Sequence, residues 1–128
     1  MSRITHVEIY GGDPGVLADF YRAVLGWQIE KMEGLAYHRI IAPEGEAAGI
    51  GGGITQPPGD GPAGFVPFIS VAAIDDVIAA AEAHGGRVVR PKAAVARTAW
   101  VAILADPAGN RFAVWQADPT AFPPLAPD

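Results

Sequence analysis

Two ionisable side chains near the start of the chain could act together on a bound molecule. His6 and Glu8 lie two residues apart in a segment that alternates apolar and polar side chains. Such alternation predicts a β-strand, and residues two apart on a strand point to the same side. A carboxylate raises the pKa of a neighbouring imidazole, so the pair could serve as an acid/base couple. The alternative is structural: a buried polar pair satisfied by Tyr10, Arg39 or Arg111.

Aromatic side chains form a second group of candidate site residues. Small-molecule pockets are typically lined by large aromatic walls with few polar groups. Aromatic residues also fill ordinary cores, which is the alternative for each of them and the stronger one for Trp27. The aromatic candidates for a pocket are Tyr37, Phe68, Trp100 and Trp115.

A helix is expected to follow the first strand and to pack against it. Asp13 suits the N-cap and Pro14 the first helical position, while Gly26 can adopt the left-handed conformation that ends a helix. Between them, apolar residues recur at i, i+3, i+4, i+7 and i+8, which predicts one buried helical face. These residues are Leu17, Phe20, Tyr21, Val24 and Leu25.

The same series of elements occurs twice. Adding 60 to the residue number takes Leu17 to Val77 and Gly26 to Gly86, and adding 63 takes Tyr37 to Trp100. Such an internal repeat predicts two βαβββ modules, one over about residues 1–57 and one over about 64–117. The expected strands are 4–10, 27–31, 37–42 and 47–54, then 65–71, a strand from 87, 100–104 and 111–116. A proline-rich tail, 118–128, is expected to be extended and poorly tied down.

Composition narrows the function classes. A net charge of −5 over 128 residues argues against a nucleic-acid partner, which needs a basic face. The absence of cysteine excludes disulfides, thiol nucleophiles and thiolate metal sites. We see no membrane-length apolar run and no basic-then-apolar leader, so we expect a single cytoplasmic domain with no membrane partner.

Four segments carry a family resemblance through their order and spacing: residues 5–9, 20–27, 71–75 and 106–110. They resemble the vicinal oxygen chelate superfamily, which includes glyoxalase I, bleomycin-resistance proteins and extradiol dioxygenases. The resemblance covers Ile4 to about Gln116. It implies an α+β fold in which two paired βαβββ modules form a half-open, eight-stranded barrel around a ligand pocket. It also implies a homodimer.

Enzymes that this chain resembles hold a divalent metal with one ligand from each of four strands. His6 matches the first position, whereas Val66 and Ala113 fall on two others and glycines near 49–51 on the fourth. A metal site needs several converging donors, so these positions argue against metal-dependent chemistry. Residues 6–9, 51–53, 66–71 and 111–116 more closely resemble a branch of the superfamily that lacks the ligands, often labelled as related to lactoylglutathione lyase. No metal and no other cofactor is therefore expected, a divalent metal being the alternative.

Small and apolar groups at the ligand positions predict a drier, roomier pocket for a hydrophobic or aromatic molecule. Ala113→Trp is expected to block this pocket while leaving the fold intact. Besides His6 and Glu8, the two candidates for a catalytic role, the expected ligand-binding residues are Tyr10, Tyr37, Val66, Phe68, Ser70, Trp100, Arg111, Ala113 and Trp115.

Three functions remain open at this stage. The first is a metal-independent protein that binds a small molecule. The second is a lyase, isomerase or dioxygenase in which His6 and Glu8 act as acid and base or bind metal. The third is an interaction module whose dimer is the functional unit.

Overall fold

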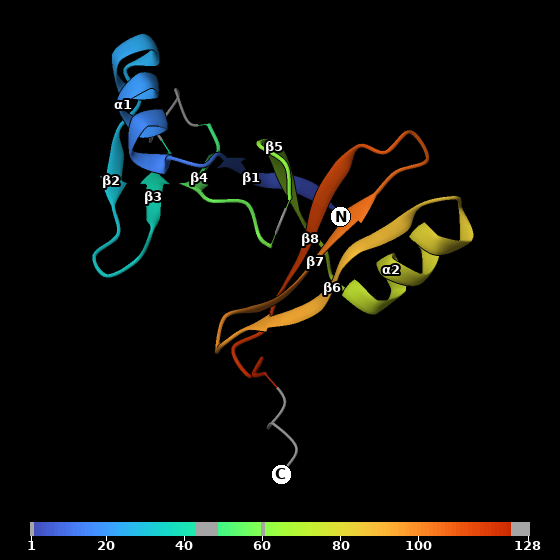
Figure 1. The fold of residues 1–128 in the computed structure, drawn as a ribbon. Helices are drawn as coiled ribbons and strands as arrows, with labels where there is room; N and C mark the ends of the chain where they lie inside the picture. Colours follow the sequence, from blue (N-terminus) through green and yellow to red (C-terminus); the bar gives the residue numbers. More distant parts are fainter. Residues whose placement is uncertain (1, 43–48, 60, 124–128) are drawn as a thin grey trace. The chain divides into compact units, whose positions relative to one another are not determined.

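The computed structural model describes residues 2–42, 49–59 and 61–123, which contain eight strands and two helices (Figure 1). Each half of the chain has the order strand, helix, three strands, so the predicted α+β class with two βαβββ modules is confirmed. Module one has β1 Arg3–Tyr10, α1 Pro14–Leu25, β2 Ile29–Lys31, β3 Tyr37–Ile40 and β4 Gly51–Thr55. Module two has β5 Gly64–Ser70, α2 Ile74–Ala83, β6 Arg87–Val95, β7 Ala99–Ala105 and β8 Arg111–Ala117. Within the described chain, neither helix has the length and apolar character needed to cross a membrane.

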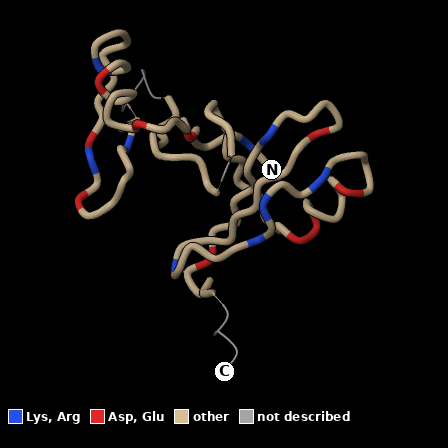
Figure 2. Tube along the Cα trace, in the orientation of Figure 1, with Lys and Arg blue, Asp and Glu red and all other residues tan. Residues whose placement is uncertain are grey.

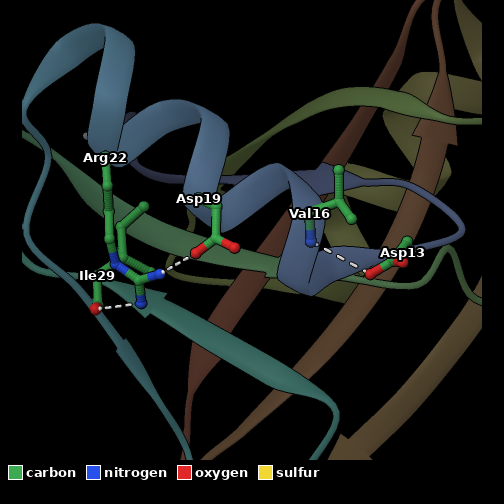
Figure 3. Close-up of polar contacts among 5 residues, drawn as sticks. All are labelled: Asp13, Val16, Asp19, Arg22 and Ile29. Carbon is green, nitrogen blue, oxygen red and sulfur yellow. Dashed lines mark hydrogen bonds and ion pairs between the residues drawn. The ribbon is translucent and has the colours of Figure 1, made fainter.

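The strands of module one are hydrogen bonded in the order β2-β3-β4-β1, with β1 parallel to β4 and the other pairs antiparallel. Helix α1 begins and ends as predicted. The Asp13 side chain accepts a hydrogen bond from the backbone N–H of Val16 at 3.2 Å, and Gly26 has φ 69°. Figure 3 also shows Arg22, which contacts Asp19 at 3.0 Å and donates to the Ile29 carbonyl oxygen at 2.8 Å. Arg22 thus ties the last turn of α1 to the start of β2.

The predicted apolar face of α1 is only partly buried. Leu17, Ala18 and Tyr21 pack against the module-one core, but Phe20 and Val24 are 53% and 59% exposed. Leu25, also predicted to be buried, is 53% exposed at the helix end. The helix contacts the sheet mainly through the small Ala18 side chain, so Phe20 and Val24 point away from the sheet. The core itself consists of Ile9, Ala18, Ile29, Ile40 and Ile54.

The strands of module two follow the order β5-β8-β7-β6, with β5 parallel to β8. Helix α2 has no side-chain cap of its own at Ala73; instead the Gln116 side chain on β8 accepts a hydrogen bond from the Ile74 N–H at 2.8 Å. The core of this module lies between α2 and the strands, and consists of Val71, Ile74, Ala102, Leu104 and Val114.

The first residues after β8 are tied down, contrary to the sequence prediction for the tail. The Asp118 N–H donates to the Thr98 carbonyl oxygen at 2.9 Å, and the Arg97 N–H donates to the Ala121 carbonyl oxygen at 2.7 Å. Ala121 is fully buried. Residues 124–128 of the predicted tail, and residues 47 and 48 of the predicted fourth strand, lie outside the described residues.

Pairing in the two modules corrects the predicted offset between their third strands. Gly53 on β4 pairs with Arg39 on β3, and its counterpart sixty residues on, Ala113 on β8, pairs with Ile103 on β7. The offset from β3 to β7 is therefore 64, because 103 minus 39 is 64, rather than 63. Because strand side chains alternate, an error of one residue moves every side chain to the other face.

Two sequence assignments change as a result. The module-two counterpart of Tyr37 is Val101 rather than Trp100, since Tyr37 pairs with Thr55 and Val101 pairs with Trp115. The module-one counterpart of Ala113 is Gly53, rather than a glycine at 49–51. The residue at that position still has no side chain.

Candidate functional site

The candidate site of module one lies on the face of the sheet opposite α1. On β1, Ile9 is buried with Ile54 in the core beneath the helix. Side chains alternate along a strand, so His6 and Glu8 point to the other face. Their direct partners on β4 are the glycines Gly51 and Gly53, which leave space beside them.

A pocket of about 320 Å³ opens here, and all of its described lining belongs to module one. Its base is formed by glycines for which no larger residue can substitute. A Cβ atom at Gly52 would overlap the Val7 carbonyl oxygen, and one at Gly51 would lie 2.7 Å from the Ile40 carbonyl oxygen. The pocket is lined by Thr5, His6, Tyr37, Arg39, Ile40, Ala42, Gly51 and Gly52.

Two tyrosine hydroxyls fix the Glu8 carboxylate next to this pocket. Tyr10 donates to Glu8 Oε1 at 3.0 Å, and Tyr37 donates to Oε2 at 2.8 Å. Tyr37 reaches Glu8 by crossing over Gly53, where a Cβ atom would overlap the tyrosine ring. Burial, and then the negative charge of Glu8, raise the pKa of Tyr37, so the hydroxyl stays protonated and keeps donating. The sequence also allowed a structural role in which Tyr10 satisfies the polar pair, and for Glu8 the structure shows this hydrogen bond.

The pKa of His6 is lowered, which reverses the expectation from the sequence. Burial lowers the pKa of this half-buried imidazole, and the carboxylate of Glu8 raises it by a smaller amount. His6 is therefore a neutral imidazole at neutral pH, able to act as a proton acceptor.

This lowered pKa predicts how stability depends on pH. The unfolded chain binds more protons at His6 than the folded chain, so the stability that neutral His6 contributes is complete above its unfolded pKa near 6.5 and is lost as pH falls through the lower folded value. Thermal unfolding at pH 7.5 and pH 5.0 measures this. We expect His6→Asn to lose less stability than wild type over that interval. The exposed His84, replaced by Asn, is the control; equal losses in wild type and His6→Asn would contradict the prediction.

Module two brings together a separate group of predicted residues. Phe68 pairs with Ala113, and Ser70 pairs with Trp115, so these four side chains share one face. The rings of Phe68 and Trp115 lie 6.4 Å apart, and Ala113 is fully buried. By the same alternation, Arg111 lies on this face two residues before Ala113. Val66, also buried, precedes Phe68 by two residues on β5. That these residues and His6 line one pocket stays a prediction.

Trp100 does not share this face, so its predicted place in the pocket wall is corrected. It pairs with Gln116 and packs on the core beneath α2. The indole N–H donates to Asp118 at 3.0 Å, and Lys92 Nζ lies 4.7 Å from the ring centre. Trp100 is therefore a structural residue that holds the segment after β8.

Of the predicted ligand-binding residues, Tyr37 lines the pocket of module one together with His6, while Tyr10 and Glu8 adjoin it through the hydrogen bonds above. Arg39, expected from the sequence only as a polar partner of His6 and Glu8, also lines the pocket. A usable signal was present: Arg39 is two residues after Tyr37 on one strand, so the two side chains share a face.

The donors present do not fit the four-ligand metal site of the enzymes that the sequence resembles. His6 is a donor, but Gly53, Val66 and Ala113 at the other positions cannot bind metal. Within residues 2–42, 49–59 and 61–123, no three His, Asp or Glu side chains cluster closely enough to hold a metal ion. The nearest carboxylate, Glu8, has both oxygens engaged by tyrosine hydroxyls.

Comparison with known proteins identifies the fold family. The family described as "Glyoxalase-like domain" matches residues 6–115. A glyoxalase/bleomycin resistance protein/dioxygenase superfamily member from Vibrio splendidus 12B01 superposes with a TM-score of 0.64 at 16% identity, covering 92% of this chain and 100% of the other. A hypothetical protein from Bacillus halodurans C-125 gives 0.62 at 17% identity, covering 94% and 98%.

A third similar structure is a variant of Streptomyces coelicolor methylmalonyl-CoA epimerase in complex with 2-nitronate-propionyl-CoA. Its TM-score is 0.58 at 18% identity, covering 94% of this chain and 98% of the other. No curated protein sequence matches this chain. At such identities the similar structures show the fold alone.

Proposed function

Because this chain belongs to the glyoxalase-like domain family, we propose that it binds a small hydrophobic or aromatic molecule, without a metal, in the pocket of module one. The observation that carries the proposal is the pocket itself. Its volume, about 320 Å³, lies at the small end of the roughly 300–1,000 Å³ usual for small-molecule sites. Ala42 and the glycine strand supply apolar surface, and a few polar groups converge on it.

The proposal that no metal takes part rests on the donor set. Only His6 remains of the four positions used by the related enzymes, and a single imidazole would hold a divalent ion weakly. An organic ligand would then be oriented by direct contact with the polar side chains of the lining rather than through a metal ion.

Titration with a neutral aromatic probe, 2-naphthalenemethanol, tests this proposal. We expect chemical-shift changes in amide NMR spectra to centre on His6, Tyr37 and Gly51. Ala42→Trp should fill the pocket and weaken binding by about tenfold or more, because the probe and the indole compete for the same apolar volume.

Ala79→Trp is the matched control, since Ala79 is an exposed residue of α2 in the other module. It adds the same indole group far from the pocket and should leave binding unchanged. Shift changes confined to module two, or equal binding by both variants, would contradict the proposed site.

A second function, proton transfer, is supported by one specific arrangement. The neutral imidazole of His6 can act as a general base, and the neighbouring Glu8 carboxylate is held by two tyrosine hydroxyls. A lyase or isomerase would use such a pair, and one similar structure is an epimerase by its description. The discriminating result is a product formed from a bound compound that disappears in His6→Asn while binding is retained.

The predicted homodimer, the cytoplasmic location and the absence of nucleic-acid and membrane partners are kept as proposals that rest on the sequence and on the family resemblance. If no small molecule bound, the remaining proposal would be an interaction module whose homodimer is the functional unit.

A further inference from the structure

We infer that Arg39 anchors a carboxylate, so that the ligand of the module-one pocket is a hydrophobic or aromatic carboxylic acid. This inference rests on the proposed function and deepens it, because it assigns the chemical class of the molecule that the same pocket accepts. It follows from the position of Arg39, from its lack of partners and from the surface beside it.

Arg39 lies on β3 between two positions that leave its side chain uncovered. On one side it pairs with Gly53 of β4, which has no side chain, and on the other with Glu30 of β2. No ion pair joins Arg39 to Glu30. Beyond Gly53 lies Glu8, whose two carboxylate oxygens each accept a hydrogen bond from a tyrosine.

Within the described chain, the Arg39 side chain makes no hydrogen bond and no ion pair, although it lines the pocket. Two other cations do have partners: Arg22 pairs with Asp19 at 3.0 Å, and Lys92 pairs with Asp75 at 3.1 Å. The chain has 9 Lys and Arg against 14 Asp and Glu, and Figure 2 marks these positions in blue and red along the described trace. Arg39 therefore lacks an ion-pair partner among the described residues, even though acidic residues outnumber basic ones in the chain. A negatively charged ligand can supply this partner.

The geometry of the guanidinium group selects the kind of anion. Its planar fork of N–H donors matches the two oxygens of a carboxylate, and such bidentate pairs are stronger than hydrogen bonds between neutral groups. On the same face His6 and Tyr37 are neutral, and the negative charge of Glu8 is hydrogen bonded to two tyrosine hydroxyls.

The surface beside Arg39 selects the rest of the molecule. Ala42 and the bare backbone of Gly51 and Gly52 form an apolar surface next to the guanidinium. A flat apolar body lying on this surface places its carboxylate at Arg39. The pocket thus combines one charged anchor with apolar contact area, which is the usual composition of a site for a small organic acid.

Two probes that differ in one group test the inference. The anion 2-naphthoate and the neutral 2-naphthalenemethanol share the naphthalene ring, and both are titrated into the full chain by calorimetry and NMR. We expect 2-naphthoate to bind about tenfold tighter or more, as expected for a hydrogen bond to a charged group. In Arg39→Gln that advantage should disappear, while the affinity for 2-naphthalenemethanol stays the same.

Arg90→Gln is the matched control, because Arg90 is also an exposed arginine on a strand but lies on β6 in module two. It removes the same charge and should leave both affinities unchanged. Arg39 is exposed, so Arg39→Gln should keep its melting temperature. Arg39→Lys, which keeps the charge and loses the fork, should show an intermediate affinity for 2-naphthoate.

Three results would overturn the inference, and they separate it from the proposed function. Equal binding of both probes at His6 and Tyr37, unaffected by Arg39→Gln, would remove the carboxylate anchor and leave the proposed function standing. Failure of both probes to perturb the pocket would overturn both proposals. Inorganic phosphate that binds as tightly as 2-naphthoate, and also depends on Arg39, would show a general oxyanion site rather than one for hydrophobic carboxylic acids.

Discussion

Replacing Gly52 with valine is expected to destabilise module one by about 3 kcal/mol or more, an effect at the upper end for an overpacked position. The reason is the close approach of β4 to β1. A Cβ atom at Gly52 would overlap the Val7 carbonyl oxygen and lie 2.8 Å from the carbonyl carbon. These are backbone atoms, so relief requires the two strands to separate, and the pocket base would be lost with them.

Urea unfolding, with tyrosine and tryptophan fluorescence as the signal, measures this effect. Gly12→Val provides the control, because a Cβ atom at Gly12 would have no heavy atom within 4 Å. The control is expected to change the free energy of unfolding by less than about 1 kcal/mol, as for ordinary surface positions. Similar unfolding midpoints for the two variants would show that β1 and β4 do not approach each other as described.

Ala113→Trp is expected to destabilise module two by about 3 kcal/mol, a cost typical of inserting a large side chain into a packed site. The sequence suggested that this substitution would fill an open pocket and leave the fold intact. In the structure Ala113 is fully buried, between Phe68 on β5 and Ile103 on β7, which are also buried. An indole therefore has to displace its neighbours.

Thermal unfolding of Ala113→Trp beside Ala108→Trp measures this cost. Ala108 lies in the exposed turn before β8, so the control adds the same side chain outside the core. We expect a melting temperature lower by several degrees for Ala113→Trp alone. An unchanged melting temperature would restore the original expectation of an open space beside Ala113.

Local signals were sufficient to predict the elements of the fold. Asp13, Pro14 and Gly26 mark the ends of α1 because the N-cap and the left-handed C-cap use side-chain chemistry that is visible in the sequence. The alternation of β1 placed Ile9 in the core and His6 on the opposite face for the same reason. Each of these features depends on neighbours in the chain rather than on tertiary contacts.

The position of Trp100 could not be predicted in this way. Its face follows from its pairing with Gln116 on β8, while the preceding strand, β6, carries irregularities between Val88 and Arg90 and between Arg90 and Ala93. A bulge adds a residue to one strand, which shifts the alternation of everything that follows. Sequence similarity between the modules allowed offsets of 63 and 64, and only the pairing of β7 with β8 separates them.

The candidate site was predicted in part for a similar reason. His6 and Tyr37 followed from alternation and family resemblance, and both line the pocket. The lowered pKa of His6 depends on how deeply the imidazole is buried, and the clamp on Glu8 depends on Gly53 leaving room for Tyr37. Both are tertiary properties, set by the distance between strands that are far apart in the sequence.

The claim that this protein binds its ligand without a metal is tested most directly by titrating chelator-treated, metal-free protein with 2-naphthalenemethanol. Amide NMR follows His6, Tyr37 and Gly51 during the titration. We predict the same affinity before and after treatment with EDTA, and no gain when Zn²⁺, Mn²⁺ or Ni²⁺ is added back. Binding that is lost with EDTA and restored by a stoichiometric divalent ion held through His6 would contradict the account.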